Sequence, residues 1–327
     1  MQQRLAPRLG RTVSAIGLGT WQLGAEWGEV SDTEADAILD AAFERGIDFL
    51  DTADIYGGGR SERRIGRRLM GLGRPIFVAT KLGRRSDPGW PQNFEFEAMR
   101  RHAAESRERL GVESLDLLQL HCVPTAVLLE GRIFDHLRRL KAEGIIRAFG
   151  ASVESSEQAR ICLRQDGIAS LQIIFNVLRQ TPIETVFDDA RRLGVAIIVR
   201  LPLASGLLTG KFRIDTRFGD DDHRNYNRDG EAFHAGETFA GLPFDRGLQV
   251  VEELRALVPE GMTLATMSQR WILDHDAVTT VITGATRREQ VMENASCASL
   301  PPLSATLHAR LREIWAARVR GLVRGHD

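Results

Sequence analysis

Four polar residues stand at or just beyond the ends of three apolar, strand-like runs and could together move a proton. They are Asp51 and Tyr56 after the first run, Lys81 after the second and His121 after the third. A phenol with a pKa of about 10 is a slow acid at neutral pH unless a nearby cation lowers that value. Lys81 can be that cation, Asp51 can keep it charged, and His121 can donate a hydrogen bond to the receiving oxygen. These residue types predict a site that delivers a proton to a substrate.

The composition supports a special role for Lys81. Only three lysines, Lys81, Lys141 and Lys211, occur among the 43 basic residues, and Tyr56 and Tyr226 are the only tyrosines. Arg stays charged and forms a planar fork, whereas the pKa of Lys can be tuned, so a retained Lys suggests chemistry that Arg cannot supply. Chance in an Arg-rich sequence explains Lys141 on a polar helix face.

The totals exclude several classes of function. A length of 327 residues suits an α/β barrel or two α/β domains, and a net charge of −1 without long like-charge runs gives no reason to expect nucleic acid or membrane partners. Cys122, Cys162 and Cys297 are too scattered for a disulfide framework or a metal site, so no metal is expected. Without an apolar leader or a run long enough to span a bilayer, the chain is expected to be cytoplasmic.

Short apolar runs alternate with amphipathic stretches almost throughout, which is typical of repeated βα units. Eight strands are expected, at Ser14–Gly19, Asp48–Asp51, Ile76–Thr80, Leu115–His121, Ile145–Ala151, Ser170–Phe175, Ala196–Arg200 and Val278–Thr283. The helices expected between them include Asp32–Arg45, Ser61–Met70, Phe94–Leu110, Ile133–Glu143, Glu157–Arg164 and Glu184–Leu193. A capping-box pattern at Ser31 and glycines such as Gly111 and Gly194 mark helix ends.

Eight βα units predict a single-domain (β/α)8 TIM barrel over residues 1–327, with its site at the C-terminal mouth. Residues 201–245 form a long loop after the seventh strand. Six aromatic residues in this loop indicate that it folds over the cofactor or substrate rather than staying disordered. Residues Ser304–Val319 predict an extra C-terminal helix that packs on the barrel.

The Gly-rich stretch Gly17–Gln22 does not match the dinucleotide-binding fingerprint, because its sixth position is Gln. Its glycines are expected to let the first strand turn at the barrel mouth. Trp21 and Trp27 can each line the pocket or pack on its rim, and the sequence leaves both possibilities open.

The stretch Asp48–Gly57 resembles the signature of the aldo-keto reductase superfamily, which couples an Asp at a strand end to a Tyr five residues later. Ala79–Lys81 is similar to the Lys segment of that family, and Leu115–His121 to its His strand. Further matching segments follow in family order, so the resemblance covers roughly residues 10 to 300. Coincidence does not explain a match of this extent.

The resemblance implies an NADPH-dependent oxidoreductase that reduces a small aldehyde or ketone to an alcohol. Tyr56 would then be the general acid in reduction or the base in oxidation. Lys81 and Asp51 would tune it, and His121 would position the substrate carbonyl. The physiological substrate, the preferred direction and the oligomeric state stay open.

The resemblance also implies cofactor contacts. Ser152 and Gln172 would hold the nicotinamide amide, the loop Leu203–Lys211 would wrap the pyrophosphate, and Glu293 with Asn294 would hold the adenine edge. The full expected set is Gly19, Thr20, Trp21, Asp51, Ser152, Gln172, Arg200, Pro202, Leu203, Ser205, Gly206, Leu207, Lys211, Gly284, Thr286, Arg288, Gln290, Glu293 and Asn294.

Three positions depart from the family pattern. Val153 stands where an Asn often lies, Arg200 where an aromatic ring often stacks on the nicotinamide, and Gln290 where some branches have an Arg on the 2′-phosphate. Arg287 and Arg288 near a helix start still favour NADP(H), because a 2′-phosphate needs cationic donors. Use of NAD(H) is not excluded.

Two other functions fit parts of the sequence. The family resembled includes potassium-channel accessory subunits that keep the barrel and cofactor, so a catalytically weak regulatory subunit is the alternative. An enzyme that forms a Schiff base on Lys81 would leave Tyr56 and the phosphate loop without a role. Carbonyl reduction therefore explains more of these residues than either alternative.

Overall fold

Eight parallel strands close into a barrel in the order β10-β3-β4-β5-β6-β7-β8-β9. The computed structural model describes residues 1–24, 30–220 and 222–325. The barrel strands are β3 (Ile16–Gly19), β4 (Phe49–Asp51), β5 (Phe77–Leu82), β6 (Leu115–His121), β7 (Ile146–Ser152), β8 (Ile168–Ile174), β9 (Ala196–Arg200) and β10 (Val278–Gly284). The predicted (β/α)8 barrel is confirmed, and each predicted strand overlaps one of the eight.

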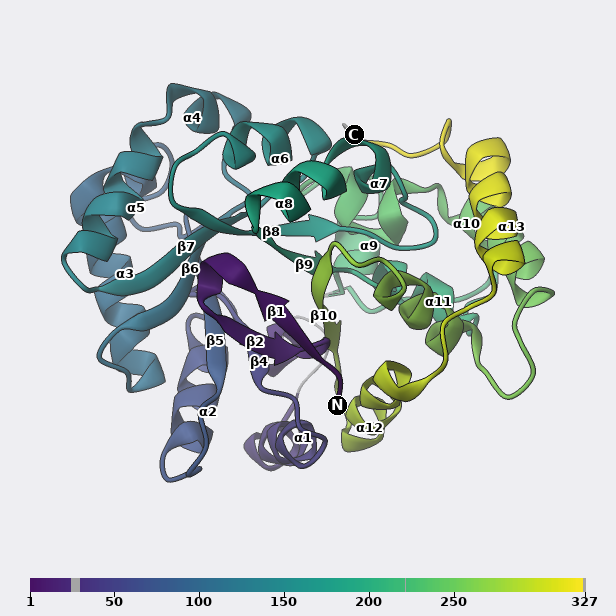
Figure 1. Cartoon of the computed structure of the whole chain (residues 1–327), viewed down its shortest axis with the longest axis horizontal. Helices are drawn as coiled ribbons and strands as arrows, with labels where there is room; N and C mark the ends of the chain where they lie inside the picture. Colours follow the sequence, from purple (N-terminus) through teal and green to yellow (C-terminus); the bar gives the residue numbers. More distant parts are fainter. Residues whose placement is uncertain (25–29, 221, 326–327) are drawn as a thin grey trace.

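Helices surround the barrel (Figure 1). They are α1 (Asp32–Glu44), α2 (Arg60–Leu69), α3 (Phe96–Leu110), α4 (Thr125–Glu130), α5 (Arg132–Ala142), α6 (Ser156–Leu163), α7 (Pro182–Thr185), α8 (Phe187–Leu193), α9 (His223–Tyr226), α10 (Phe244–Arg255), α11 (Leu264–Leu273), α12 (Arg288–Ser296) and α13 (Ala305–Ile314). The predicted helix Glu184–Leu193 is divided into α7 and α8, because Val186 leaves the helical conformation at φ −132°. No helix in the described ranges is long and apolar enough to cross a membrane.

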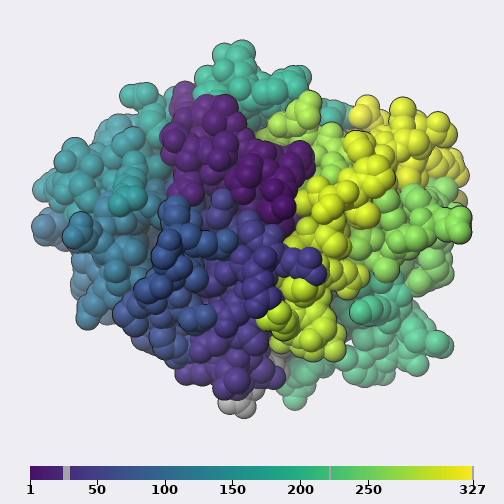
Figure 2. Space-filling view, turned by 60° about the horizontal axis from the view of Figure 1, so that its bottom comes forward, coloured from purple at the N-terminus to yellow at the C-terminus, as the bar shows by residue number. Residues whose placement is uncertain are grey.

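The structure adds a hairpin that the sequence pattern did not predict. Strands β1 (Gln3–Ala6) and β2 (Arg11–Ser14) pair antiparallel and lie across the N-terminal end of the barrel (Figure 1, purple). Val13 is fully buried against the barrel interior. Figure 2 shows the N-terminal residues beside the C-terminal segments, and Arg4 Nη1 donates to the carbonyl of Val278 at 2.6 Å. The hairpin therefore closes the floor of the barrel.

The barrel interior changes from apolar to polar along strands β4 and β5. Alternate residues of a strand point inward, so the interior is built in layers. The lower layer, which forms the floor of the barrel, is one buried apolar cluster. It is made of Val13, Phe49, Phe77, Ala79, Leu117, Ala148, Ala169, Ile198 and Ile282. Two positions further along their strands, Asp51 follows Phe49 and Lys81 follows Ala79, and both polar residues are buried. Floor and mouth thus differ in polarity within one strand length.

The long segment after β9 contributes Phe239 and Phe244 to the main hydrophobic core, while its role as a cover over the cofactor or substrate stays a prediction. Phe212, Phe218, Phe239 and Phe244 pack together with ring centroids 4.9 to 6.4 Å apart. Helix α13 is the predicted extra helix, continued by a π-helical turn over Trp315–Val319. Beyond it, Arg324 Nε donates to the carbonyl of Gly241 at 3.1 Å, so the C-terminal segment holds the long segment in place.

Candidate active site

A cavity of about 1300 Å³ opens at the C-terminal ends of the barrel strands. Asp51 and Tyr56 line it from β4 and the following loop, and His121 lines it from the end of β6. Ser152 of β7 and Gln172 of β8 complete its inner wall. The mouth of the barrel therefore brings the predicted polar residues together.

Lys81 lies beneath the cavity and connects two of these residues. Its Nζ donates to Asp51 Oδ1 at 2.5 Å, to the carbonyl of Thr52 at 2.8 Å and to Tyr56 Oη at 3.4 Å. Asp51 Oδ2 also accepts a hydrogen bond from Gln172 Nε2 at 2.7 Å. Lys81 is 1% exposed and Asp51 2% exposed, so water screens this ion pair little. The phenol thus faces a fixed, buried cation.

The charges of this group set the protonation of Tyr56. Burial alone lowers the pKa of Lys81, but Asp51 and Tyr56 outweigh it and the pKa is raised overall, so Lys81 is a cation at neutral pH. Burial raises the pKa of Tyr56, and Lys81 opposes only part of that rise. The cation acts in the predicted direction, yet the pKa of the phenol ends above its ordinary value rather than below it. Tyr56 therefore carries its proton at neutral pH, as a general acid must.

His121 lies edge-on to the phenol, with ring centroids 5.8 Å apart and an interplanar angle of 85°. Its Nδ1 is buried and has no hydrogen-bond partner among the described residues. Burial, followed by the charges of Arg84, Lys81 and Arg200, holds the pKa of His121 well below its usual value. A neutral imidazole carries one N–H, which can donate to an oxygen placed beside Tyr56.

Aromatic residues form another side of the cavity. Trp21 lines it and stacks on Tyr56, with ring centroids 5.9 Å apart and an interplanar angle of 19°. Trp90 and Tyr226 stand at the same cavity and are 52% and 38% exposed. Trp21 is therefore a pocket residue, while Trp27 lies outside the described residues.

The chain after β9 turns sharply around the cavity. Leu201, Ala204 and Ser205 have φ angles of 53°, 49° and 55°, which are uncommon for residues with a Cβ. Ser205 Oγ donates to the carbonyl of Glu237 at 2.9 Å and so ties this turn to the long segment. Turned backbone of this kind presents amides to anions, and Lys211 lines the cavity at the end of the loop. The turn and the cavity size fit the phosphates of an extended dinucleotide.

Most of the predicted cofactor contacts line this cavity. They are Gly19, Thr20, Trp21, Asp51, Ser152, Gln172, Arg200, Pro202, Leu203, Ser205, Gly206, Lys211, Gly284, Thr286 and Gln290. Four do not. Leu207 is buried in the apolar core, Asn294 is buried on α12, and Glu293 is exposed on the same helix. Arg288 pairs with Glu44 of α1 at 2.5 Å instead of pointing into the cavity.

The start of α12 is capped by Gln290. Its Oε1 accepts from the backbone N–H of Thr286 at 2.7 Å and of Arg287 at 3.3 Å. A helix start favours anions, but here a neutral amide oxygen already takes these donors. Arg287 is exposed and Arg288 is paired elsewhere, so preference for NADP(H) stays a prediction.

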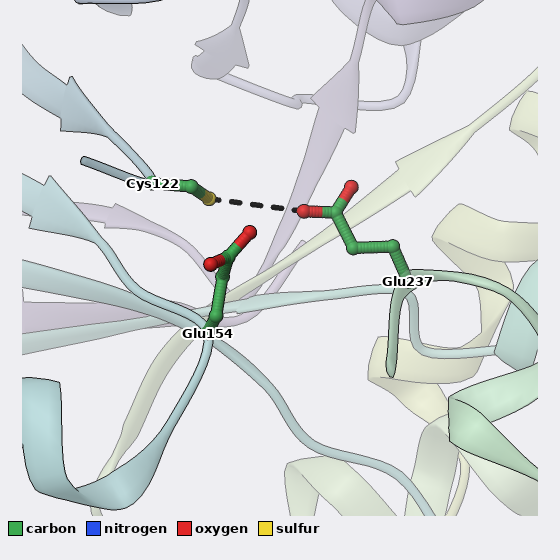
Figure 3. Close-up of side chains that lie close together, drawn as sticks. All are labelled: Cys122, Glu154 and Glu237. Carbon is green, nitrogen blue, oxygen red and sulfur yellow. Dashed lines mark hydrogen bonds between the residues drawn. The ribbon is translucent and has the colours of Figure 1, made fainter. Parts of the chain in front are cut away.

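The cavity wall contains a buried ionic group that the motifs did not reveal. Arg84 Nη2 donates to Glu154 Oε1 at 3.0 Å, and Arg200 Nη1 lies 3.3 Å from Glu237 Oε1. Figure 3 shows Cys122, Glu154 and Glu237 facing one another, with the thiol 3.8 Å from Glu237. Arg84, Cys122 and Glu154 each follow the C-terminal end of a strand, which is the signal that could have found them.

The chain is similar to known proteins in both sequence and fold. The model of the Aldo/keto reductase family matches residues 15–316. A Bacillus subtilis protein described as an uncharacterized oxidoreductase is 28% identical over 290 residues, covering 88% of each chain. The NADH-specific methylglyoxal reductase of Escherichia coli is 28% identical over 92% of this chain and 95% of that protein. The structure of a glycerol dehydrogenase from Gluconobacter oxydans matches with a TM-score of 0.78 and 27% identity, covering 97% of this chain and 96% of that one.

Proposed function

Since the chain belongs to the aldo/keto reductase family, we propose that it is an NADPH-dependent oxidoreductase that reduces a small aldehyde or ketone to an alcohol. The observation that carries this proposal is the connected group of Asp51, Lys81 and Tyr56 beneath one cavity, with His121 edge-on to the phenol. In this proposal residues 1–327 act as one barrel domain.

The residues of the mouth divide the proton chemistry among them. When bound, the cofactor would supply a hydride for the carbonyl carbon. His121 donates a hydrogen bond to the carbonyl oxygen and orients it, and Tyr56 gives its proton to that oxygen as negative charge develops there. Lys81, 3.4 Å from the phenol oxygen, stabilises the phenolate that remains, and Asp51 holds Lys81 in position.

Residues of the same cavity would hold the cofactor. Ser152 and Gln172, which line the cavity, would hold the nicotinamide amide, and the turn before Lys211 would hold the phosphates. Arg288 would leave Glu44 to meet a 2′-phosphate. This exchange is easy, because both side chains are about half exposed and water weakens an exposed ion pair strongly.

An absorbance assay of NADPH oxidation tests the proposal. The protein is mixed with NADPH or NADH and a panel of aldehydes and ketones, and the alcohol formed is quantified. We expect one alcohol for each cofactor oxidised, with a higher kcat/KM for NADPH than for NADH. Tight NADPH binding without turnover on any carbonyl would instead favour the accessory role, and borohydride trapping of a substrate on Lys81 would favour Schiff-base chemistry.

A further inference from the structure

Beside His121, the cavity wall holds four charged side chains whose charges balance. Arg84 Nη2 lies 3.0 Å from Glu154 Oε1 and 3.5 Å from Glu237 Oε1, and Arg200 Nη1 lies 3.3 Å from Glu237 Oε1. All four residues line the cavity, and their side chains are 8 to 19% exposed. Two guanidiniums face two carboxylates, so this wall is strongly polar and carries no net charge.

The charged wall lies directly beside His121, the residue proposed to bind the substrate carbonyl. Arg84 Nε donates to the carbonyl of His121 at 3.1 Å. Cys122, the next residue, has a φ of 51°, and its thiol lies 3.6 Å from Arg200 Nη2. Arg84 and Arg200 also lie close enough to the imidazole to lower the pKa of His121. We therefore expect a substrate whose carbonyl oxygen meets His121 to extend its neighbouring carbon atoms toward this wall.

Two polar atoms of the wall have no hydrogen-bond partner among the described residues. Arg84 uses Nε and Nη2, and its Nη1 makes no hydrogen bond within the described part of the chain. Glu154 Oε1 accepts from Arg84, whereas Oε2 accepts from none of the described residues. These two side chains are the more open members of the group, 19% and 18% exposed. The unused donor and the unused acceptor belong to one ion pair, with Arg84 Nη2 3.0 Å from Glu154 Oε1. A hydroxyl group can satisfy both, because it donates and accepts at once.

Charged ligands do not fit this wall. Cys122, Glu154 and Glu237 place their donor atoms within 4.8 Å of one another, a spacing that a metal ion could bridge. Both carboxylates already face guanidiniums, however, so a divalent cation would meet Arg84 and Arg200. A substrate carboxylate would add a third negative charge to a balanced and buried group, which is costly. A neutral polar group avoids both penalties.

We propose that Arg84 and Glu154 form a hydroxyl subsite, which selects 2-hydroxyaldehydes and similar hydroxylated carbonyl compounds over plain alkyl aldehydes. This inference rests on the proposed function and names the substrate class for the same site. A hydroxyl beside the carbonyl accepts from Arg84 Nη1 and donates to Glu154 Oε2. An alkyl chain in the same place excludes water from both polar atoms and forms no hydrogen bond with either, so it binds less favourably.

The test compares glyceraldehyde with propanal, using NADPH, in the wild type and in Glu154→Met and Glu154→Gln. We expect the wild type to have a higher kcat/KM for glyceraldehyde. Glu154→Met should lower the glyceraldehyde-to-propanal ratio at least about tenfold, by a loss on glyceraldehyde alone. Glu154→Gln should retain part of the ratio, because its amide oxygen still accepts a hydrogen bond. Hydration of each aldehyde is the same for every variant and cancels when variants are compared.

Two controls separate the loss of a contact with the substrate hydroxyl from a general disturbance of the protein or of its cofactor binding. Arg147→Met removes an exposed Arg that pairs with Asp116 at the opposite end of β7, and both activities should be unchanged. Fluorescence of bound NADPH should give the same Kd for all variants. An equal loss on both aldehydes in Glu154→Met, or a wild type without preference, would overturn the subsite while carbonyl reduction stands. Absence of turnover on the entire carbonyl panel would overturn both proposals.

Discussion

The floor and the mouth of the barrel come from the same strands but differ in what they bury. Strand β4 contributes Phe49 to the floor and Asp51 to the mouth, and β5 contributes Ala79 and then Lys81. Burial of apolar surface at the floor is favourable, whereas burial of charge at the mouth has a desolvation cost. The comparison indicates that the floor stabilises the barrel and that the mouth uses some of this stability to hold charges in a dry, fixed geometry.

The largest expected effect comes from removing the buried cation of the mouth. Lys81→Met should lower kcat/KM for carbonyl reduction by about 10²–10⁴-fold, because the phenolate loses its partner. The free energy of unfolding should fall by about 3–5 kcal/mol, because Asp51 is left as an unpaired buried charge. Steady-state kinetics and urea unfolding measure the two effects.

A second substitution separates the effect of Lys81→Met on activity from its effect on stability. Adding Asp51→Asn to Lys81→Met should recover most of the lost stability and none of the lost activity. Recovered activity in the double variant would show that Lys81 only balances the charge of Asp51.

A floor substitution should have the opposite profile. Leu117 is fully buried in the floor cluster, on the strand that ends at His121. Leu117→Ala should lower the free energy of unfolding by about 2–5 kcal/mol, while kcat/KM at a temperature where the protein is folded should change less than about threefold. Urea unfolding and kinetics on the same preparation decide this. A large loss of activity without loss of stability would mean that floor and mouth are not separable.

Asp54 tests whether a buried carboxyl near the mouth carries a stability cost. It is 3% exposed, and burial, followed by the nearby Glu62, raises its pKa to about 8. The native state thus holds this proton more tightly than the unfolded chain, in which the pKa is about 4. The contribution of Asp54 to stability should therefore fall as pH rises from about 4 to about 8.

Asp54→Asn should remove this pH dependence and raise the free energy of unfolding at pH 8 by roughly 1–3 kcal/mol. Urea unfolding at several pH values gives the slope for the wild type and the variant. If both proteins lose the same stability between these pH values, Asp54 is not the group responsible.

The smallest expected effect concerns the outer rim of the mouth. Arg288→Met should weaken NADPH binding about tenfold, which is about 1.4 kcal/mol, and leave NADH binding within about twofold. The reason is that only NADPH has a 2′-phosphate for this guanidinium. Fluorescence titration with both cofactors measures it, with Lys141→Met as a control on a distant helix face. Equal weakening for both cofactors would rule out recognition of the 2′-phosphate by Arg288.

How far the sequence predicts the molecule depends on the range of the interactions involved. Asp51, Lys81 and His121 are predictable because the end of a strand fixes where its last side chains lie. The side chain of Leu207 is buried in the apolar core instead of lining the cavity, and spacing along a loop does not say which way a side chain turns. Its contact with the cofactor stays a prediction. The pair of Arg288 with Glu44 joins positions 244 residues apart, so no local pattern reveals it.

The hairpin β1–β2 and the charged wall of the cavity could not be predicted from local sequence patterns. Strands β1 and β2 precede the first of the repeated βα units, so the repeat that predicts the barrel strands does not reach them. Arg84, Glu154 and Glu237 come from three separate loops, so only the closed barrel brings them together. Local pattern thus predicts the elements and their ends, while contacts between distant loops require the structure.

The most direct test of the central claim is hydride transfer in Tyr56→Phe, measured in a single turnover. Phe keeps the ring that stacks on Trp21 and removes only the hydroxyl that faces Lys81. With saturating NADPH and an aldehyde that the wild type reduces, the account predicts hydride transfer slowed by about 10²–10⁴-fold and a Kd for NADPH within about twofold of wild type. Hydride transfer at the wild-type rate would contradict the role of Tyr56 as the acid.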